Sequence, residues 1–231
     1  MVPDPDVARR LTKYFGGVKF TVKPHEAPVA VPSPMRHASV DADSRLRVAV
    51  IGAIGIIKGY EVLLACARDA RKRGLPIDFV VYGYTMNDVA LKREGVTITG
   101  RYLDQYADQG LATLAPHCIW LPYVWPETYS YTLSIALRYG HPIFAFDLGA
   151  IASRLHSIAA DEYLMPLSLA WNPRELNARF AAYRSALLLR QPSPAPEGRL
   201  SEAEFEPGSE PVERNIDLST VDPTIPLVKA W

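Results

Sequence analysis

Residues 118–149 read CIWLPYVWPETYSYTLSIALRYGHPIFAFDLG, a pattern that predicts a strand, a loop, a helix and a second strand. The apolar run Cys118–Leu121 is followed by Pro126-Glu127-Thr128, which introduces a helical segment that ends at Gly140. A second apolar run occupies Ile143–Phe146. In a parallel crossover of this kind, the helix starts at the carboxyl edge of the sheet, where its free amides and its dipole favour an anion.

The start of this helix is the first candidate binding site. We expect Thr128–Thr132 to face the ligand, with the carboxylate of Glu127 beside them. Acidic and hydroxyl residues are also common helix caps, so a purely capping role for Glu127 and Thr128 is an alternative that these residues alone leave open.

The composition is that of a globular protein with enough apolar residues for one large domain. The chain has 231 residues, of which 48% are hydrophobic and 22% charged, and its formal net charge is zero at pH 7. A balanced charge creates no field that would attract a nucleic-acid backbone or an anionic membrane. We therefore expect a small-molecule partner held by a local site, and no nucleic acid.

The sequence predicts a cytoplasmic protein without an integral membrane segment. The first residues, MVPDPDVARR, lack the apolar stretch of a signal peptide, and no run approaches the roughly 20 apolar residues that span a bilayer. Cys66 and Cys118 lie in apolar patterns, and we expect both to be buried and reduced.

Residues 46–190 alternate short apolar runs with helical patterns, which predicts an α/β fold with a doubly wound parallel sheet. The expected strands are Val48–Ile51, Ile77–Val81, Val96–Thr99, Cys118–Leu121, Ile143–Phe146 and Tyr163–Met165. The expected helices are Tyr60–Arg73, Asn87–Arg93, Asp104–Ala115 and one from Pro173 capped by Asn172, with a loop at Gly52–Gly59 and a turn at Gly83-Tyr84.

Both ends of the chain differ from this middle. Residues 1–26 contain a short helical pattern, Val7–Phe15, and a strand pattern, Val18–Val22, which read as the last pieces of a preceding domain. The Pro-rich residues 27–45 are expected to form a linker. Residues 191–231 are rich in Pro, Ser and Glu, a composition that predicts a mostly disordered tail.

Four stretches in this order resemble the donor-binding C-terminal half of the group 1 retaining glycosyltransferases. They are VAVIGAIGIIKGYEVLLACA, FVVYGY, VTITGRY and LPYVWPETYSYTLSIALRYGHPIFAFDLGAIASRL, within Arg47–Tyr183. The family is built from two facing Rossmann-like domains, the GT-B architecture, and the resemblance implies that residues 46–190 are the C-terminal one. By the same resemblance, residues 1–26 would be the remnant of a preceding acceptor domain.

The resemblance assigns the two residues expected to be catalytic. Lys58 matches the lysine that neutralises the donor diphosphate, after the glycine-rich turn that contains Gly52 and Gly55. A cation there stabilises the negative charge that develops as the glycosidic bond breaks. Glu127 matches the carboxylate that binds hydroxyls of the donor sugar. A solvated loop lysine is the alternative for Lys58.

Further positions are implied to bind the donor. The resemblance places the diphosphate on the amides and hydroxyls at the start of the helix, and the sugar beside a glycine-containing loop; the matching residues are Thr128, Ser130, Tyr131, Thr132, Gly149 and Ala150. Gly100, Arg101 and Tyr102 end a strand at the same edge and are candidates to frame the base. The alternative is that the tyrosines pack the helix and that Asp147 caps a turn.

The chain departs from the family pattern at two positions. Ala53 stands where a basic residue is common, and Ile135 stands where a second glutamate usually holds the ribose. Eight residues separate Glu127 from Ile135, a little over two helical turns, so we expect both near one helix face, with the isoleucine presenting hydrocarbon to the site.

The sequence therefore predicts a glycosyltransferase donor domain that binds a nucleotide-activated sugar for retaining transfer to a polysaccharide or glycolipid acceptor. The acceptor would be held through a missing N-terminal domain, so the chain alone is expected to be truncated and inactive. A degenerate nucleotide-binding module and a nucleotide-sugar epimerase-like enzyme are the alternatives. No metal or other cofactor is expected: the resemblance implies no bound metal, and His25, His117, His141 and His156 show no metal-ligand spacing among themselves.

Overall fold

A computed structural model describes residues 1–27, 29 and 37–190 of the chain. The predicted tail, residues 191–231, lies outside the described residues, as do residues 28 and 30–36 of the predicted linker. The division of the chain into an N-terminal remnant, a linker, a domain and a tail stays a prediction.

The described residues confirm the α/β fold with a doubly wound parallel sheet. Its six parallel strands are β1 (Leu46–Ile54), β2 (Ile77–Thr85), β3 (Thr97–Ile98), β4 (Cys118–Leu121), β5 (Ile143–Phe146) and β6 (Leu164–Met165). Their order in the sheet is β3-β2-β1-β4-β5-β6. The strand order reverses between β1 and β4, and sheets of this class bind ligands at the carboxyl edge of such a point.

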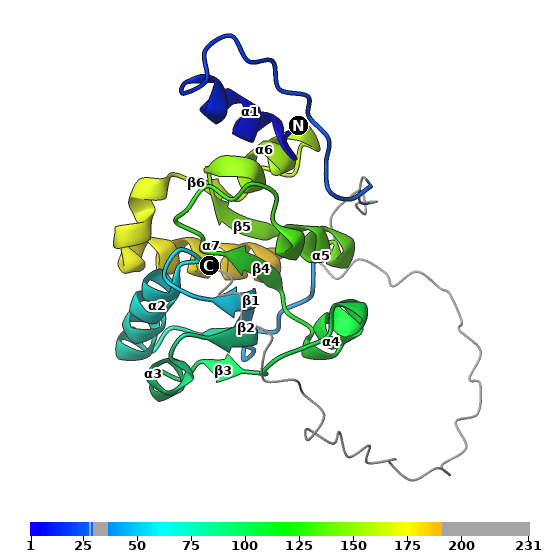
Figure 1. The fold of residues 1–231 in the computed structure, drawn as a ribbon. Helices are drawn as coiled ribbons and strands as arrows, with labels where there is room; N and C mark the ends of the chain where they lie inside the picture. The colour runs from blue at the N-terminus through cyan, green and yellow to red at the C-terminus, as the bar shows by residue number, and fades with distance from the viewer. Residues whose placement is uncertain (28, 30–36, 191–231) are drawn as a thin grey trace, which may run out of the picture. The chain divides into compact units, whose positions relative to one another are not determined.

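Helices cover the sheet on both sides. Figure 1 shows α2 and α3 on one side of the sheet and α4 and α5 on the other. The helical elements are α1 (Pro5–Thr12), α2 (Tyr60–Arg73), α3 (Asp88–Arg93), η1 (Asp104–Tyr106), α4 (Ala107–Leu114), α5 (Tyr131–Tyr139), α6 (Gly149–Ser157), η2 (Leu167–Trp171) and α7 (Pro173–Leu189). None of these helices is long and apolar enough to cross a bilayer.

Helix α2 has both boundaries that the sequence predicts, and α7 begins at the predicted residue. The expected helix Tyr60–Arg73 is α2, which ends at Gly74 in the left-handed conformation after three basic residues. The side chain of Asn172 caps α7 by accepting a hydrogen bond from the amide of Glu175 at 3.1 Å, and Pro173 occupies the first turn.

The centre of the core is an aromatic cluster between the sheet and α7. The ring of Phe180 in α7 lies 5.2 Å from that of Trp120 in β4 and 5.0 Å from that of Phe144 in β5, measured between centroids. Phe79 in β2 lies 5.9 Å from Phe180. Because three strands contribute to one cluster under α7, the middle of the sheet is fixed by packing as well as by backbone hydrogen bonds.

Some predicted boundaries were wrong. Val18–Val22 is no strand, because its only recorded pairing among the described residues is an isolated bridge between Val22 and Val2. Gly83-Tyr84 continues β2, since Gly83 pairs in register with Gly52 of β1, which runs on to Ile54. The first helix spans Pro5–Thr12, and the helix expected over Asp104–Ala115 is divided into η1 and α4.

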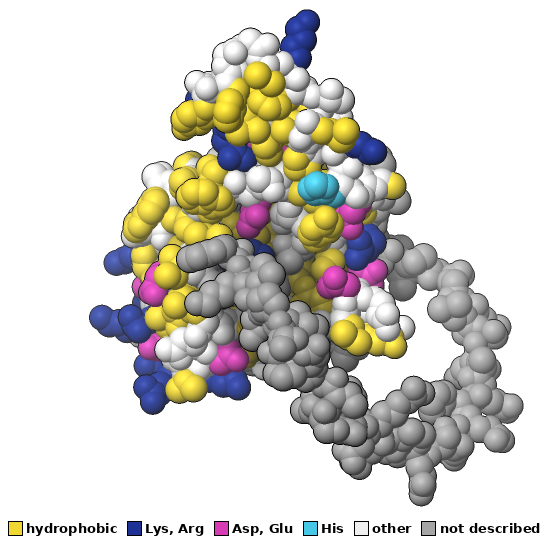
Figure 2. Space-filling model, in the orientation of Figure 1, with side chains coloured by type: hydrophobic (Ala, Val, Ile, Leu, Met, Phe, Trp, Pro, Cys, Tyr) yellow, Lys and Arg dark blue, Asp and Glu magenta, His cyan; other side chains and the backbone are white. Residues whose placement is uncertain are grey.

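The N-terminal residues pack against α6 while part of their surface stays apolar. Helix α1 lies next to α6. Hydrophobic side chains gather at the top of the view in Figure 2, where Figure 1 places α1 and the chain that follows it. The large exposed hydrophobic residues of this segment are Met1, Tyr14, Phe15, Val18 and Val22.

We expect Gly59→Ala to destabilise the protein. Gly59 has a φ of 81°, and a Cβ atom there would lie 1.9 Å from the carbonyl oxygen of Pro122. The left-handed backbone alone costs an alanine about 1–2 kcal/mol, and each kcal/mol lowers Tm by about 2–4 °C in a domain of this size. Thermal unfolding should therefore show a fall of several degrees.

Gly55→Ala is the matched control in the same loop. No atom lies within 4 Å of a Cβ atom at Gly55, so its stability should change by no more than about 0.5 kcal/mol. Equal melting temperatures for the two variants would contradict the close approach of Gly59 to Pro122.

Candidate functional site

The candidate site lies at the carboxyl edge of the sheet, where the loops that follow β1 and β4 meet. The amide of Val124 donates a 3.0 Å hydrogen bond to the carbonyl of Ile57, and Gly59 abuts Pro122. These contacts bring the loop at 55–59 against the loop at 122–130. They form at the point between β1 and β4 where the strand order reverses.

A chain of hydroxyl groups joins the end of β1 to the start of α5. The Tyr123 hydroxyl lies 3.3 Å from the carbonyl oxygen of Ile51 and 2.9 Å from Oγ1 of Thr132. Oγ1 of Thr132 lies 3.0 Å from Oγ of Ser130. Burial raises the pKa of Tyr123, so its hydroxyl stays protonated and able to donate at neutral pH.

Gly52 permits this close approach of α5 to β1. Its φ is 112°, and a Cβ atom there would lie 3.0 Å from Cγ2 of Thr132. A side chain at Gly52 would therefore press on the first turn of α5. The loop predicted over Gly52–Gly59 begins later than expected, because Gly52 belongs to β1, which runs to Ile54.

Lys58 joins the same cluster. Its ammonium nitrogen lies 5.4 Å from the centroid of the Tyr123 ring, within the range of a cation–π interaction, and the residue is half-buried. Tyr123 thus contacts Lys58 with its ring and Thr132 with its hydroxyl. The structure brings Gly52, Lys58, Ser130 and Thr132 together around one tyrosine, and their roles in binding stay predictions.

Helix α5 begins later than the sequence suggests. Its first residue is Tyr131, and Ser130 is the cap, with its Oγ accepting a hydrogen bond from the amide of Leu133 at 3.3 Å. Thr128 lies exposed in the preceding loop, so it is not part of the helix start. Among the described residues, the amides of Tyr131 and Thr132 have no recorded acceptor, as expected in the first turn of a helix.

Ser130 holds an unusual backbone conformation. Its φ is 72°, one of a few positive φ values at non-glycine residues in the described chain. Such a conformation costs an ordinary residue energy and persists only where surrounding contacts impose it. The turn from Tyr129 to Tyr131 is therefore held by its neighbours and not by its own preference.

Glu127 is held by its backbone and carries an unsatisfied side-chain oxygen. Its carbonyl accepts hydrogen bonds from the amide of Ala150 at 3.1 Å and from Nη2 of Arg10 at 3.3 Å. Oε1 of Glu127 is buried and has no hydrogen-bond partner among the described residues. A buried carboxylate oxygen without a donor is costly, so this position favours a donor from a bound molecule or water.

The expected relation between Glu127 and Ile135 was wrong. Glu127 lies in the loop before α5, so the two residues do not share a helix face. Ile135 is 5% exposed and belongs to the hydrophobic core cluster. The eight residues from Glu127 to Ile135 do not form two helical turns, because α5 begins four residues after Glu127.

The first turn of α6, after β5, closely approaches the Glu127 loop. Gly149 has a φ of 64°, and a Cβ atom there would lie 2.6 Å from Cα of Pro126. Ala150 is fully buried and its amide is already used by the carbonyl of Glu127. These two residues therefore position Glu127, and any direct contact with a sugar stays a prediction.

The residues expected to frame the base lie at the β2 and β3 side of the same edge. The amide of Gly100 donates to the carbonyl of Gly83 at 2.9 Å. The guanidinium of Arg101 lies 4.3 Å from the centroid of the Tyr84 ring, and Tyr84 pairs with Ala53 in the sheet. The neighbouring residue stacks as well, since the ring of Tyr102 lies 4.5 Å from that of Tyr82 with an interplanar angle of 14°.

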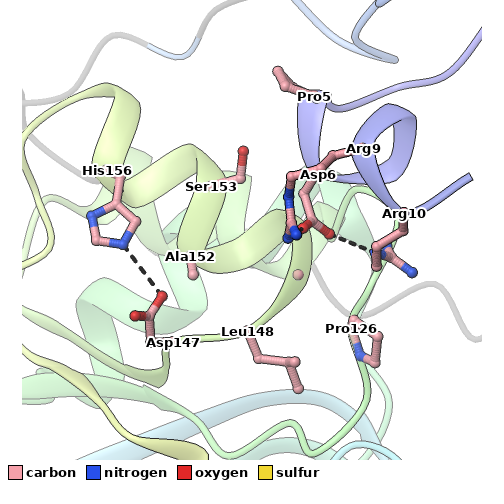
Figure 3. Close-up of a pocket in the computed structure, with 11 residues that line it drawn as sticks. Pro5, Asp6, Arg9, Arg10, Pro126, Asp147, Leu148, Ala152, Ser153 and His156 are labelled. Atoms are coloured by element: carbon pink, nitrogen blue, oxygen red, sulfur yellow. Dashed lines mark hydrogen bonds and ion pairs between the residues drawn. The ribbon is translucent and has the colours of Figure 1, made fainter. Parts of the chain in front are cut away.

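A pocket that the sequence did not predict, lined by both charged and apolar side chains, lies between α1 and α6. Its volume is about 420 Å³. Figure 3 shows Asp6, Arg9 and Arg10 of α1 on one side and Ser153 and His156 of α6 on the other. The loop segments Pro126 and Asp147–Gly149 complete the lining. In the sequence, the spacing of Asp6, Arg9 and Arg10 indicates ion pairs along one face of a helix. No sequence pattern indicates that this face lies against α6.

The charged groups of this pocket pair with one another. Asp6 bonds both Arg9 and Arg10, the latter at 2.7 Å. The imidazole of His156 lies 2.6 Å from the carboxylate of Asp161 and 3.3 Å from that of Asp147, and these bonds, that to Asp161 first, raise the pKa of His156. The described residues contain no group of three or more side chains placed to hold a metal ion.

No family model matches the chain, and no curated protein matches it in sequence. Solved structures to which it is similar include the pneumococcal O-GlcNAc transferase GtfA in complex with UDP and GlcNAc, at 17% identity and a TM-score of 0.49, covering 80% of this chain and 37% of that chain. A variant of TarM from S. aureus, in a complex that includes UDP, has 14% identity and a TM-score of 0.49, covering 81% and 39%.

A third similar structure is the C-terminal domain of a group 1 family glycosyl transferase from Francisella tularensis. It has 16% identity and a TM-score of 0.45, and the match covers 63% of this chain and 79% of that domain. The chain spans less than two fifths of the first two structures. At these identities and TM-scores, the similarity does not by itself assign a function to this chain.

We expect Ile135→Glu to destabilise the protein without improving nucleotide binding. The new carboxylate would be buried among apolar side chains, at a cost on the order of 3 kcal/mol. Urea unfolding should show this loss at pH 7. Burial raises the pKa of such a carboxyl group, so the loss should shrink as the pH falls toward the ordinary pKa of glutamate.

Ile135→Leu is the control of similar volume, with an expected cost below about 1.5 kcal/mol. A stable Ile135→Glu protein with higher affinity for a nucleoside diphosphate would instead place this side chain at the ribose.

Proposed function

We propose that this chain binds a nucleotide-activated sugar and acts as the donor domain of a glycosyltransferase. One observation carries the proposal. Around Tyr123 lie the cation of Lys58, the bare backbone of Gly52 and the free amides at the start of α5. Beside them is the carboxylate of Glu127, which has an oxygen without a hydrogen-bond partner among the described residues. The first three are the elements of a diphosphate site. The carboxylate is an acceptor for sugar hydroxyls.

The diphosphate would lie between Lys58 and the first turn of α5. Lys58 is the cation of this cluster, and its half-buried position weakens the screening of its charge by water. The amides of Ser130, Tyr131 and Thr132 donate to nothing else among the described residues, so they are available to phosphate oxygens. As the glycosidic bond breaks, this arrangement would stabilise the charge on the departing diphosphate.

The sugar would lie beside Glu127 and the Gly149 loop. The carbonyl of Glu127 is held by Ala150 and Arg10, so only its side chain is left to bind a ligand, and the buried Oε1 would turn toward the edge to do so. A sugar hydroxyl donating to Oε1 would remove the cost of the buried, unpartnered oxygen. This role explains why the loop before α5 is held so firmly.

We further propose retaining transfer to a polysaccharide or glycolipid acceptor. The acceptor would be bound by a surface facing this edge, supplied by a further domain. Exposed apolar side chains around the site support such a covering surface, because large apolar groups at a water-facing edge favour contact with another surface. They are Ile56, Ile57, Trp125 and Tyr131. No metal is required by this proposal, since Lys58 and the α5 amides provide the positive charge.

A nucleotide-binding module without catalysis is the second candidate. Ala53 leaves the edge with one fewer cation than the family pattern, and Ile135 is buried in the core where that pattern has a ribose-binding glutamate. Such a module would bind a nucleoside diphosphate and its sugar conjugate equally, because the Glu127 contact would be unused. An epimerase-like enzyme would need further acid and base groups at this edge.

We expect Lys58→Ala to weaken binding of a nucleoside diphosphate. Loss of a charge-assisted contact of about 1.5–3 kcal/mol corresponds to about ten- to a hundredfold in the dissociation constant. Titration calorimetry with UDP, ADP and GDP measures the change. Inorganic diphosphate should lose affinity by a similar factor, because Lys58 faces the phosphates.

Lys72→Ala removes the same charge from the exposed last turn of α2, at the opposite end of that helix from the Lys58 loop. Its affinity should equal that of the unaltered protein. An unchanged dissociation constant in Lys58→Ala would remove Lys58 from the site and with it the proposed diphosphate position.

The chain by itself should bind donor without transferring sugar. Holding an acceptor hydroxyl against the anomeric carbon can supply about 7–11 kcal/mol of the barrier. The described residues before β1 form a single helix, α1, which is too small for an acceptor surface of that kind. Incubation with nucleotide sugars and a glycolipid should give product at background level. Clear transfer by the homogeneous chain would show that it carries its own acceptor site.

A further inference from the structure

The backbone of the turn that leads into α5 is held through three of its carbonyl groups. Nη1 of Arg154 donates to the carbonyl of Tyr129 at 3.1 Å and to the carbonyl of Ser130 at 3.0 Å. The carbonyl of Glu127 is held in turn by Ala150 of the same helix, α6, and by Arg10 of α1. Residues of α6 and α1 thus donate hydrogen bonds to the carbonyl groups of the backbone that precedes α5.

A hydrogen bond that fixes the direction of a carbonyl group also fixes the direction of the N–H group in the same peptide plane. In a trans peptide, the C=O group and the N–H group of the following residue lie in one plane and point in opposite directions. The bonds from Arg154 to Tyr129 and Ser130 therefore orient the amides of Ser130 and Tyr131 away from α6. The φ of 72° at Ser130 is part of this arrangement, and contacts from outside the turn must maintain it.

Arg154 is itself held by a short relay from the N-terminal segment. Its Nη2 donates to Oγ of Ser134 at 2.9 Å, and Oγ of Ser134 donates to Oε2 of Glu26 at 2.6 Å. Ser134 is fully buried in α5, and the guanidinium of Arg154 lies 4.3 Å from the centroid of the Tyr129 ring. Burial lowers the pKa of Arg154, while Tyr129, Glu26 and Asp4 oppose that shift; a guanidinium keeps its charge in proteins.

We propose that Arg154 is a positioning residue that aims the amides of Ser130 and Tyr131 at the diphosphate, and that Glu26 sets Arg154 through Ser134. The inference rests on the proposed function for its ligand. It assigns a role to Arg154, to which the family resemblance assigns none. It also makes anion binding at α5 depend on Glu26, a residue of the N-terminal segment.

The test compares Arg154→Gln and Arg154→Lys with an arginine of the same region. Both variants lose the planar guanidinium, whose Nη1 reaches the two carbonyls while its Nη2 reaches Ser134, and the lysine keeps the charge. We expect both to weaken UDP and inorganic diphosphate alike, by about tenfold or more. Glu26→Gln, which leaves the guanidinium in place, should weaken both ligands by a smaller factor.

Arg138→Gln is the matched control. Arg138 lies on the exposed face of α5, where it pairs with Asp108 at 3.2 Å, so the variant removes one positive charge from the same helix without touching the turn. Its affinities should be unchanged. Full recovery of affinity in Arg154→Lys would overturn the positioning role, because charge alone would then be sufficient. A loss for UDP without a loss for inorganic diphosphate would also overturn it.

A second readout separates this inference from the proposed function. The Leu133 amide is bonded to Oγ of Ser130, so its hydrogen exchange reports the geometry of the turn without any ligand. Exchange at Leu133 should be faster in Arg154→Gln than in Arg138→Gln. If the unaltered chain binds no diphosphate, the proposed function fails, and Leu133 exchange still decides whether Arg154 holds the turn. Unchanged exchange with unchanged affinity would refute the inference.

Discussion

The close approach of α5 to the end of β1 is the constraint on which the candidate site depends. A Cβ atom at Gly52 would lie 3.0 Å from Cγ2 of Thr132, and one at Gly83 would lie 2.1 Å from the carbonyl oxygen of Gly52. Two paired glycines therefore make a strand edge without side chains, on which the first turn of the helix can rest. Tyr123 fills the remaining space and links Lys58 to Thr132.

The polar groups of the backbone before α5 have two roles: its carbonyls make internal hydrogen bonds, and its amides stay available to a ligand. Its carbonyls at Glu127, Tyr129 and Ser130 are used by α6 and α1, which leaves the amides of the first turn for an anion. A strained turn with all its polar groups satisfied internally would have no capacity left for a ligand. The N-terminal residues take part in this arrangement through Arg10 and Glu26, although the sequence alone suggested only the end of another domain.

Local sequence patterns were sufficient to predict the strands and several helices of the sheet, but not the geometry of the candidate site. β4, β5 and α2 have the predicted boundaries, because apolar runs, Gly74 and Pro142 act within a few residues. The start of α5 was predicted too early, because Ser130 has a φ of 72° and its carbonyl is bonded by Arg154, a residue 24 positions away that no local pattern includes. The burial of Ile135 depends on which face of α5 meets the core, and no pattern in Glu127–Ile135 shows where the helix begins.

The same burial changes what the proposed site can recognise. Ile135 contributes hydrocarbon to the core and no carboxylate to a ribose, and Ala53 contributes no cation. Binding energy would then come from the diphosphate at Lys58 and the sugar at Glu127. Discrimination among nucleosides would fall to aromatic faces near the β3 end of the sheet, where Arg101 covers Tyr84 and Tyr102 stacks on Tyr82. Stacking surfaces tolerate different bases, since every base has a π face. A donor domain built in this way would select its substrate by the sugar more than by the nucleotide.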